Sequence, residues 1–377
     1  MLSPKSAFEC LAENGINSFA GVPDSLLKDF CAYVSDHTHQ SNHVITANEG
    51  NAIAIAAGKY LGSGALSLVY LQNSGLGNIV NPLLSLVDAE VYKIPLLIMI
   101  GWRGEPSIKD EPQHIKQGRV TPSLLDSMEV PWLEIGPETV NPLQILQSVV
   151  DIIKQTQAPV ALLIRKGTFE SYKLQSKLVT DFSLTREQAI QQVLPLLPSD
   201  ALIVSTTGMT SREVFEHRVA TGEGHGQDFL TVGCMGHASS IAFGLALVKP
   251  NRPIVCLDGD GSMLMHLGAT AIQGVSNLPN FFHILINNGA HDSVGGQPTV
   301  GLKINLPKIA SICGYRHVRT TDSPKEIKDH IIDLLASDTG PNLLEIKVKK
   351  GARPDLGRPT TTPLANRNAF MSEANST

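Results

Sequence analysis

Residues 254–262 read IVCLDGDGS, and residues 282–288 read FHILINN. In both stretches an apolar run ends in small or polar residues, and residues 263–275 between them have a helical pattern. A continuous apolar run is typical of a strand buried on both faces, and the succession of strand, helix and strand favours a parallel pair. The two stretches therefore predict adjacent parallel strands of an α/β sheet.

The same alternation of apolar runs and helical patterns extends over the rest of the chain. Apolar runs rich in Val, Ile and Leu lie at 16–22, 44–47, 65–71, 95–100 and 160–164, and again at 201–205, 229–232, 253–257, 282–286 and 343–348. This pattern predicts an α/β protein with two doubly wound parallel sheets, and a length of 377 residues suits two domains. A polar stretch at 171–186 separates the two series, so we expect domains at 1–175 and 185–350. Residues 351–377, rich in Pro, Thr and Asn, are expected to form an extended tail.

Composition limits the classes of partner. The formal net charge of -5 comes from interspersed acidic and basic residues, which argues against nucleic acid or an anionic membrane as a ligand. The first 15 residues contain three charged side chains, unlike a signal peptide, and no apolar run approaches the roughly 20 residues that span a bilayer. The five cysteines have no CxxC spacing. We therefore expect a cytoplasmic protein without disulfide bonds or a zinc site.

Polar residues follow both strands of the opening stretches. The carboxyl ends of adjacent parallel strands lie at one edge of the sheet, where open α/β folds bind ligands, so Asp260 and Asn288 are expected to lie close together. A carboxylate, an amide oxygen and a backbone carbonyl suit Mg²⁺ and leave positions for diphosphate oxygens and water. Each piece alone is equally typical of an ordinary turn or strand exit. The spaced pair favours a metal site.

A GDG sequence followed after about 25 residues by NN resembles the thiamine-diphosphate fingerprint of the pyruvate decarboxylase and acetolactate synthase superfamily. The resemblance implies the thiamine-diphosphate-binding fold in both domains. It also implies that Asp260, Asn288 and the carbonyl of Ala290 bind magnesium. Further cofactor contacts are implied at Gly261, Ser262, Thr207, Gly208 and Met209 near the diphosphate, and at Gly233 and Met235 on the loop that bends the cofactor.

The first half contains TANEGNA at residues 46–52, at the junction of a strand and a helix. In the superfamily an acidic side chain binds nitrogen N1′ of the cofactor's aminopyrimidine, and Glu49 matches that position. A carboxyl group with this task should lie in an apolar place that raises its pKa. Without the second-half motif, Glu49 reads as an exposed residue that favours a helix dipole. Because the superfamily joins the two domain types across subunits, the resemblance implies a homodimer or homotetramer with shared active sites.

The two-domain form is similar to the phosphonopyruvate and sulfopyruvate decarboxylases, since most superfamily decarboxylases have a third domain. The resemblance extends over essentially the whole chain, and the stretches that carry it lie at 21–25, 72–78, 101–105, 110–114 and 355–363. It implies a small anionic 2-oxo acid substrate, with phosphonopyruvate and its product phosphonoacetaldehyde as the first expectation. Sulfopyruvate decarboxylation and a catalytically silent, cofactor-binding subunit remain alternatives.

Substrate contacts are expected in loops at the carboxyl ends of the first-half strands. The candidates are Asp24, Ser25, Gln72, Asn73, Arg103, Lys109 and His114. Arg103 has the planar fork that binds a phosphonate through two hydrogen bonds, and His114 can pair with the anion or supply a proton. Arg353 and Arg358 could close over the site if the tail forms a lid. Taken singly, Arg103, Lys109 and His114 are each more often solvated surface residues than ligands of an anion.

Overall fold

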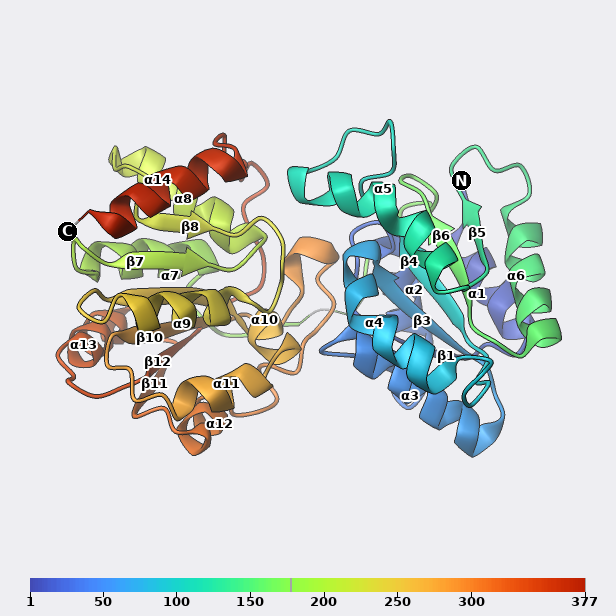
Figure 1. The fold of residues 1–377 in the computed structure, drawn as a ribbon, viewed down its shortest axis with the longest axis horizontal. Helices are drawn as coiled ribbons and strands as arrows, with labels where there is room; N and C mark the ends of the chain where they lie inside the picture. Colours follow the sequence, from blue (N-terminus) through green and yellow to red (C-terminus); the bar gives the residue numbers. More distant parts are fainter. Residues whose placement is uncertain (177, 377) are drawn as a thin grey trace. The chain divides into compact units, whose positions relative to one another are not determined.

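A computed structural model describes residues 1–176 and 178–376 of the chain. Two compact units, divided between residues 177 and 178, make up the chain, and each is described by itself (Figure 1). Lys177, in the polar stretch expected between the domains, and Thr377, at the end of the expected tail, lie outside the described residues. None of the helices within the described ranges is long and apolar enough to cross a membrane.

Unit 1 is built on a parallel six-stranded sheet. Its strands are β1 (Ser18–Gly21), β2 (His43–Ile45), β3 (Ser67–Gln72), β4 (Leu97–Gly101), β5 (Trp132–Ile135) and β6 (Val160–Ile164), in the order β2-β1-β3-β4-β6-β5. Every pairing is parallel. Five of the strands lie at the predicted apolar runs. The apolar pattern missed β5 because this edge strand is only partly buried.

Helices cover both faces of this sheet. They are α1 (Pro4–Glu13), α2 (Lys28–His37), α3 (Glu49–Ser63), α4 (Leu76–Pro82), α5 (Pro112–Ser127) and α6 (Pro142–Thr156), with short helical turns η1 (Asn73–Gly75) and η2 (Leu83–Val87). Successive strand residues point to opposite faces, so Leu68 belongs to one buried cluster and Val69 to the other. Two apolar cores result, one on each side of the sheet.

Unit 2 repeats this topology. Its strands are β7 (Leu202–Ser205), β8 (Asp228–Leu230), β9 (Ile254–Gly259), β10 (Phe281–Asn287), β11 (His317–Thr321) and β12 (Asn342–Lys347), in the order β8-β7-β9-β10-β12-β11. Within each unit the strands therefore follow the same spatial order. The predicted fold class, two doubly wound parallel sheets, is confirmed.

The helices of unit 2 differ from the expectation at two places. They are α7 (Arg186–Val193), α8 (Met209–Thr221), α9 (Ala238–Val248), α10 (Asp260–Met265), α11 (Gly268–Gly274), α12 (Leu306–Cys313), α13 (Pro324–Leu335) and α14 (Pro363–Asn375), with turns η3 (Leu194–Leu196) and η4 (Asp292–Val294). The helix expected over 263–275 is divided into α10 and α11. The expectation of an extended tail was wrong for residues 363–375, because Thr362 caps α14 and Phe370 packs against Phe229.

The topology places particular strand ends next to each other. In unit 1 the chain leaves β1 to form β2 on one side and returns to form β3 on the other, and β7, β8 and β9 repeat this reversal in unit 2. Such a switch point opens a crevice at the carboxyl ends of the two central strands, where open α/β sheets bind ligands. Asp24 and Gln72 follow or end the central strands of unit 1, and Thr206 and Asp260 follow those of unit 2.

Candidate active site

Asp260 begins α10 directly after β9 and is 2% exposed. One oxygen of its carboxylate accepts the hydroxyl hydrogen of Thr299, and the main-chain N–H of Asn288 also donates to this side chain. Burial raises the pKa of Asp260 to about 6 despite these hydrogen bonds. No ion pair with Asp260 occurs within residues 1–176 and 178–376. The strand exit thus holds a buried carboxylate that is not balanced by a neighbouring cation.

Asn288 directly follows β10 and is 6% exposed. Its Nδ2 donates to Asp292 Oδ2 over 2.7 Å, and its Oδ1 accepts the main-chain N–H of Ala290 over 3.0 Å. The preceding Asn287 instead donates into the fold, to Gly301 and Glu345. The amide of Asn287 is therefore committed to the fold, and that of Asn288 is held by Asp292 and Ala290.

The chemistry of these groups fits a magnesium ion and a diphosphate. Asp260, Asn288 and the carbonyl of Ala290 supply only oxygen ligands, as Mg²⁺ requires, and a cation would offset the buried negative charge. Nearby, both polar atoms of the Gln297 side chain are buried without a hydrogen-bond partner in the described part of the chain. A Cβ added at Gly261 would lie 3.1 Å from His291 and 3.4 Å from Met235, so a larger residue there would crowd these two side chains.

Three loops of unit 2 meet beside Asp260. The hydroxyl of Thr206 donates to Ser262 Oγ over 3.0 Å, and Ser262 Oγ also accepts the N–H of Gly236 over 3.1 Å.

Gly208 has a φ of 92°, which favours glycine, and directly precedes α8. The predicted contacts Thr207, Gly208 and Met209 therefore lie where α8 begins, and free N–H groups at such an end favour an anion. Gly233 and Met235 lie in the loop 231–237 between β8 (Asp228–Leu230) and α9 (Ala238–Val248), which also contains Gly236.

Glu49 is the first residue of α3 in unit 1 and is 5% exposed. Asn48 caps this helix by accepting the N–H of Gly50 over 2.8 Å. Asn78 donates to Glu49 Oε2 over 2.6 Å, and burial raises the pKa of the Glu49 carboxyl. The buried Thr46 hydroxyl has no partner among the described residues. A buried carboxyl with a raised pKa is what proton sharing with a weakly basic ring nitrogen needs.

Asp24 lies at the switch point of unit 1 with no exposed surface. Its Oδ2 accepts the N–H groups of Leu26 and Leu27 over 2.8 and 3.2 Å, and its Oδ1 accepts Gln72 Nε2 over 2.6 Å. Burial raises the pKa of Asp24. This carboxylate therefore holds the loop after β1 and orients Gln72.

Arg103 is engaged by its own chain. Its guanidinium binds both oxygens of Asp110, one of them from Nε over 2.8 Å, and its Nη1 donates to Ser25 Oγ over 2.8 Å. Asn73 holds the main chain of Arg103 through a donated bond of 2.8 Å and an accepted bond of 3.1 Å. The fork expected to bind a phosphonate is thus occupied by a carboxylate. A substrate anion would have to displace Asp110 or bind at an outer edge of the Arg103 guanidinium group.

The remaining first-half candidates differ in burial. His114 is 8% exposed, and burial together with the charge of Arg103 lowers its pKa. Lys109 is exposed. The structure thus gathers Asp24, Ser25 and Arg103 around Asn73 and Gln72, with His114 within electrostatic reach, and leaves Lys109 at the surface.

Sequence reasoning missed the residues that support these side chains. Asn78, Asp292 and Thr299 form hydrogen bonds with Glu49, Asn288 and Asp260, respectively. Only Asn78 lies in a stretch that carries the family resemblance, and no role was predicted for it there. Only the tertiary contacts distinguish them.

The tail segment that contains Arg353 is anchored to helices of unit 2. Arg353 forms ion pairs with Glu187 over 3.0 Å, with Asp355 over 3.1 Å and with Glu216. Gly357 N–H donates to Glu216 over 2.6 Å. These contacts tie the segment to α7 and α8 in the described conformation.

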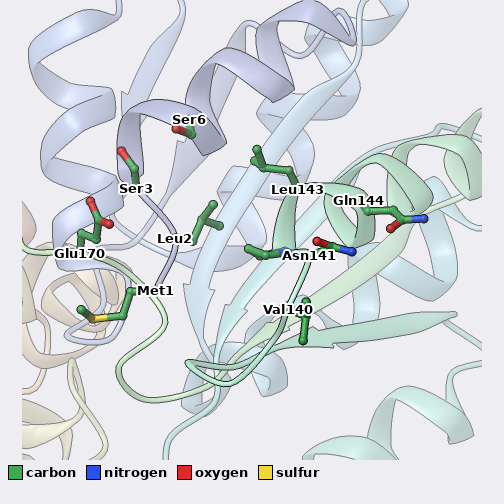
Figure 2. A pocket seen from close by; sticks show the side chains of 10 residues that line it. Met1, Leu2, Ser3, Ser6, Val140, Asn141, Leu143, Gln144 and Glu170 are labelled. Atoms are coloured by element: carbon green, nitrogen blue, oxygen red, sulfur yellow. The ribbon is translucent and has the colours of Figure 1, made fainter.

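Two other features are separate from the predicted residues. Cys256, Asp258 and His283 form a fully buried group, in which His283 contacts Asp258 over 3.3 Å and Tyr315 over 3.5 Å. We interpret this group as a hydrogen-bonded core network. A surface hollow of unit 1, about 490 Å³ in volume, is lined by the beginnings of α1 and α6 and by Glu170 (Figure 2). It contains none of the predicted site residues.

Known proteins match both units. The N-terminal TPP binding domain of thiamine pyrophosphate enzymes matches residues 5–128, and the C-terminal TPP binding domain matches residues 206–346. The chain is 37% identical to phosphonopyruvate decarboxylase from Streptomyces viridochromogenes, over 93% of this chain and 89% of that protein. It is 36% identical to phosphonopyruvate decarboxylase from Streptomyces hygroscopicus, over 96% and 92% of the two chains. It is 28% identical to sulfopyruvate decarboxylase from Methanosarcina acetivorans, over 86% and 85%. By these similarities the chain belongs to the phosphonopyruvate decarboxylase family of thiamine pyrophosphate enzymes, a family of 2-oxo acid decarboxylases.

Proposed function

We propose that this protein uses thiamine diphosphate and Mg²⁺ to convert phosphonopyruvate to phosphonoacetaldehyde and carbon dioxide, as a step of phosphonate biosynthesis. One observation carries the proposal: a buried Glu49 at the start of α3 and a buried Asp260 beside Asn288 occur in a chain with the family relationship described above. Two relatives of 36–37% identity named phosphonopyruvate decarboxylase support the substrate.

Each residue of the proposed site has a definite task. Asp260, Asn288 and the carbonyl of Ala290 would hold the metal, and the N–H groups where α8 begins would face the diphosphate. Glu49 would hold a proton at the pyrimidine nitrogen N1′. Bound thiamine diphosphate supplies an electron sink for the carbon that loses carbon dioxide. Because its pKa is lowered, the ring of His114 is neutral near pH 7, so it can accept a hydrogen bond through one nitrogen and donate through the other.

The phosphonate needs cationic or N–H partners in a partly dry site. Arg103 is already paired with Asp110. In unit 2, Arg212 lies in the first turn of α8, is half-buried, and forms no ion pair in the described ranges. Burial lowers the pKa of Arg212, so an arriving anion would offset the cost of its buried charge. Arg212 is therefore a second candidate for binding the phosphonate group.

The test is carbon dioxide release from phosphonopyruvate, sulfopyruvate and pyruvate with both cofactors present. Two or three charge-assisted hydrogen bonds of about 1.5 to 3 kcal/mol each predict a preference of several powers of ten for phosphonopyruvate over pyruvate in kcat/KM. Higher kcat/KM with sulfopyruvate would overturn the substrate and leave the decarboxylase. Cofactor binding without release from any acid would indicate a catalytically silent subunit.

The residue that binds the phosphonate group can be identified in the same assay. Arg103→Ala and Arg212→Ala are compared on phosphonopyruvate and pyruvate. A residue that binds the phosphonate should lose kcat/KM selectively on phosphonopyruvate. Equal losses on both acids would show that the residue acts on the fold or on the shared 2-oxo acid part.

Sulfopyruvate decarboxylation is the second candidate function, because the relative of that name is similar over 86% of this chain. A sulfonate has one negative charge near pH 7, whereas a phosphonate has between one and two by analogy with phosphate esters. The two acids thus test whether the second charge is recognised.

A further inference from the structure

The carboxylate of Asp292 is the common acceptor for three separate parts of unit 2. Its Oδ2 accepts hydrogen bonds from Asn288 Nδ2 over 2.7 Å, from Arg186 Nη1 over 3.0 Å and from the main-chain N–H of Gly351 over 3.0 Å. The side chain is 8% exposed. Arg186 is itself fixed, because it binds both oxygens of the buried Glu213 over 2.8 and 2.9 Å. Asp292 is therefore held in one orientation from three sides.

We propose that Asp292 is a positioning residue for the metal site, which fixes the side-chain amide of Asn288 so that its oxygen is presented to the cation. This inference rests on the proposed magnesium site. The two ends of an asparagine amide have nearly the same shape, so packing alone does not choose between them. Hydrogen bonding does choose, and only the oxygen end can bind a hard cation.

The choice follows from the chemistry of the contact. An ionised carboxylate has no hydrogen to donate, so the amide nitrogen of Asn288 must face Asp292. The amide oxygen then lies on the other side, where the N–H of Ala290 donates to it over 3.0 Å. An oxygen has a second lone pair, which remains for a metal. An amide at position 292 could donate as well as accept, and would permit the opposite orientation of Asn288.

The test measures metal binding and needs no turnover. Thiamine diphosphate binding is followed by protein fluorescence while Mg²⁺ is varied. Loss of a group that orients a metal ligand typically weakens metal affinity 10- to 100-fold, so Asp292→Asn should raise the Mg²⁺ concentration for half-saturation by about that factor. Unchanged half-saturation in a folded Asp292→Asn protein would overturn the proposal.

A matched control separates positioning from general stability. Asp228 is another buried carboxylate of unit 2, and it binds Arg218 over 3.0 and 3.1 Å. Asp228→Asn, like Asp292→Asn, weakens a buried ion pair and should lower Tm. It should leave the half-saturating Mg²⁺ concentration at the wild-type value. An equal shift in Asp228→Asn would show that loss of any buried ion pair weakens metal binding, and would overturn the positioning role.

A reciprocal exchange covers the case in which Asp292→Asn folds poorly. In the double variant Asn288→Asp/Asp292→Asn, the carboxylate at position 288 offers oxygen in either orientation, and the amide at 292 can donate to it. We expect this variant to bind Mg²⁺ more tightly than Asp292→Asn, and no recovery would overturn the proposal. Asp260→Ala tests the underlying site: unchanged metal dependence there would refute the proposed function, whereas failure of Asp292→Asn alone would refute only the positioning role.

Discussion

The carboxyl group of Asp260 carries an energetic cost that a metal would remove. Its pKa lies at about 6 in the folded chain, compared with an ordinary value of 3.8. The folded state without metal thus binds the extra proton more tightly than the unfolded state does. The associated stability, about 3 kcal/mol, is present below pH 3.8 and is lost as pH rises through about 6. Mg²⁺ needs the ionised form, so it should restore stability above that pH.

We therefore predict that Mg²⁺ affinity, measured with thiamine diphosphate present, falls up to about tenfold per unit as pH drops below 6. Calorimetry in buffers of different ionisation heat should detect about one proton released per metal at pH 5 and almost none at pH 8. Asp260→Asn should lose both the affinity and this proton release. Constant affinity between pH 5 and 8 in the wild type would contradict the ligand assignment.

Gly75 makes room for the carboxyl group of Glu49. A Cβ added at Gly75 would lie 2.6 Å from Cδ of Glu49, closer than real side chains approach. Gly75→Ala should therefore displace the Glu49 carboxyl, and a displacement of about 1 Å can lower kcat about 100-fold. Gly77→Ala is the control, because nothing lies within 4 Å of a Cβ there. Proton exchange at the cofactor's thiazolium C2, followed by NMR, should slow only in Gly75→Ala.

At the scale of elements, the N-terminus of α3 determines where Glu49 lies. Asn48→Ala removes the cap that accepts the Gly50 N–H, which should lower the free energy of unfolding by about 1 kcal/mol and also reduce kcat. Asn48→Ser, which keeps an acceptor, should retain most of both. Urea denaturation and steady-state kinetics provide the two measurements.

Asn305 is the matched control, because its side chain caps α12 by accepting the Lys308 N–H over 2.8 Å. Asn305→Ala should cost a similar free energy without loss of kcat. If Asn48→Ala had wild-type kcat despite the lost stability, the cap would not position Glu49.

At the scale of the whole molecule, two units with the same strand order carry the two halves of the proposed site. We propose that these halves join across subunits in a homodimer or homotetramer. Glu49→Gln and Asp260→Ala proteins should each be inactive. Mixed as refolded subunits, they should recover about a quarter of wild-type activity if dimers form at random, because half of the dimers are hybrids with one intact site of two.

Hybrid formation should be verified with differently tagged subunits. Purified hybrids that remain inactive would contradict a site shared between chains. Activity of the mixture proportional to the hybrid fraction would support it.

Local pattern determined the architecture of this chain. Continuous apolar runs such as 254–257 and 282–286 predict buried parallel strands, because only a strand covered on both faces needs apolar side chains on both sides. The edge strands β5 and β11 are only partly buried, so they lack a continuous apolar run and were not predicted. The helix α14 was not predicted either, because its capping and packing depend on Thr362 and Phe229. The motifs that indicated Glu49, Asp260 and Asn288 are local too. Their assignment as site residues remains a prediction.

Tertiary structure decided which polar groups are free to act. Arg103 looks in sequence like an anion-binding residue, but folding brings Asp110 and Ser25 to its guanidinium. Asp292 looks like a surface carboxylate, but folding brings Asn288 and Gly351 to it. The reason is physical: a strand or helix is encoded by neighbours along the chain, whereas a hydrogen-bond partner can come from any part of it. The residue type limits which groups a side chain can bind. Only the folded structure determines which hydrogen-bond and ion-pair partners that side chain already has.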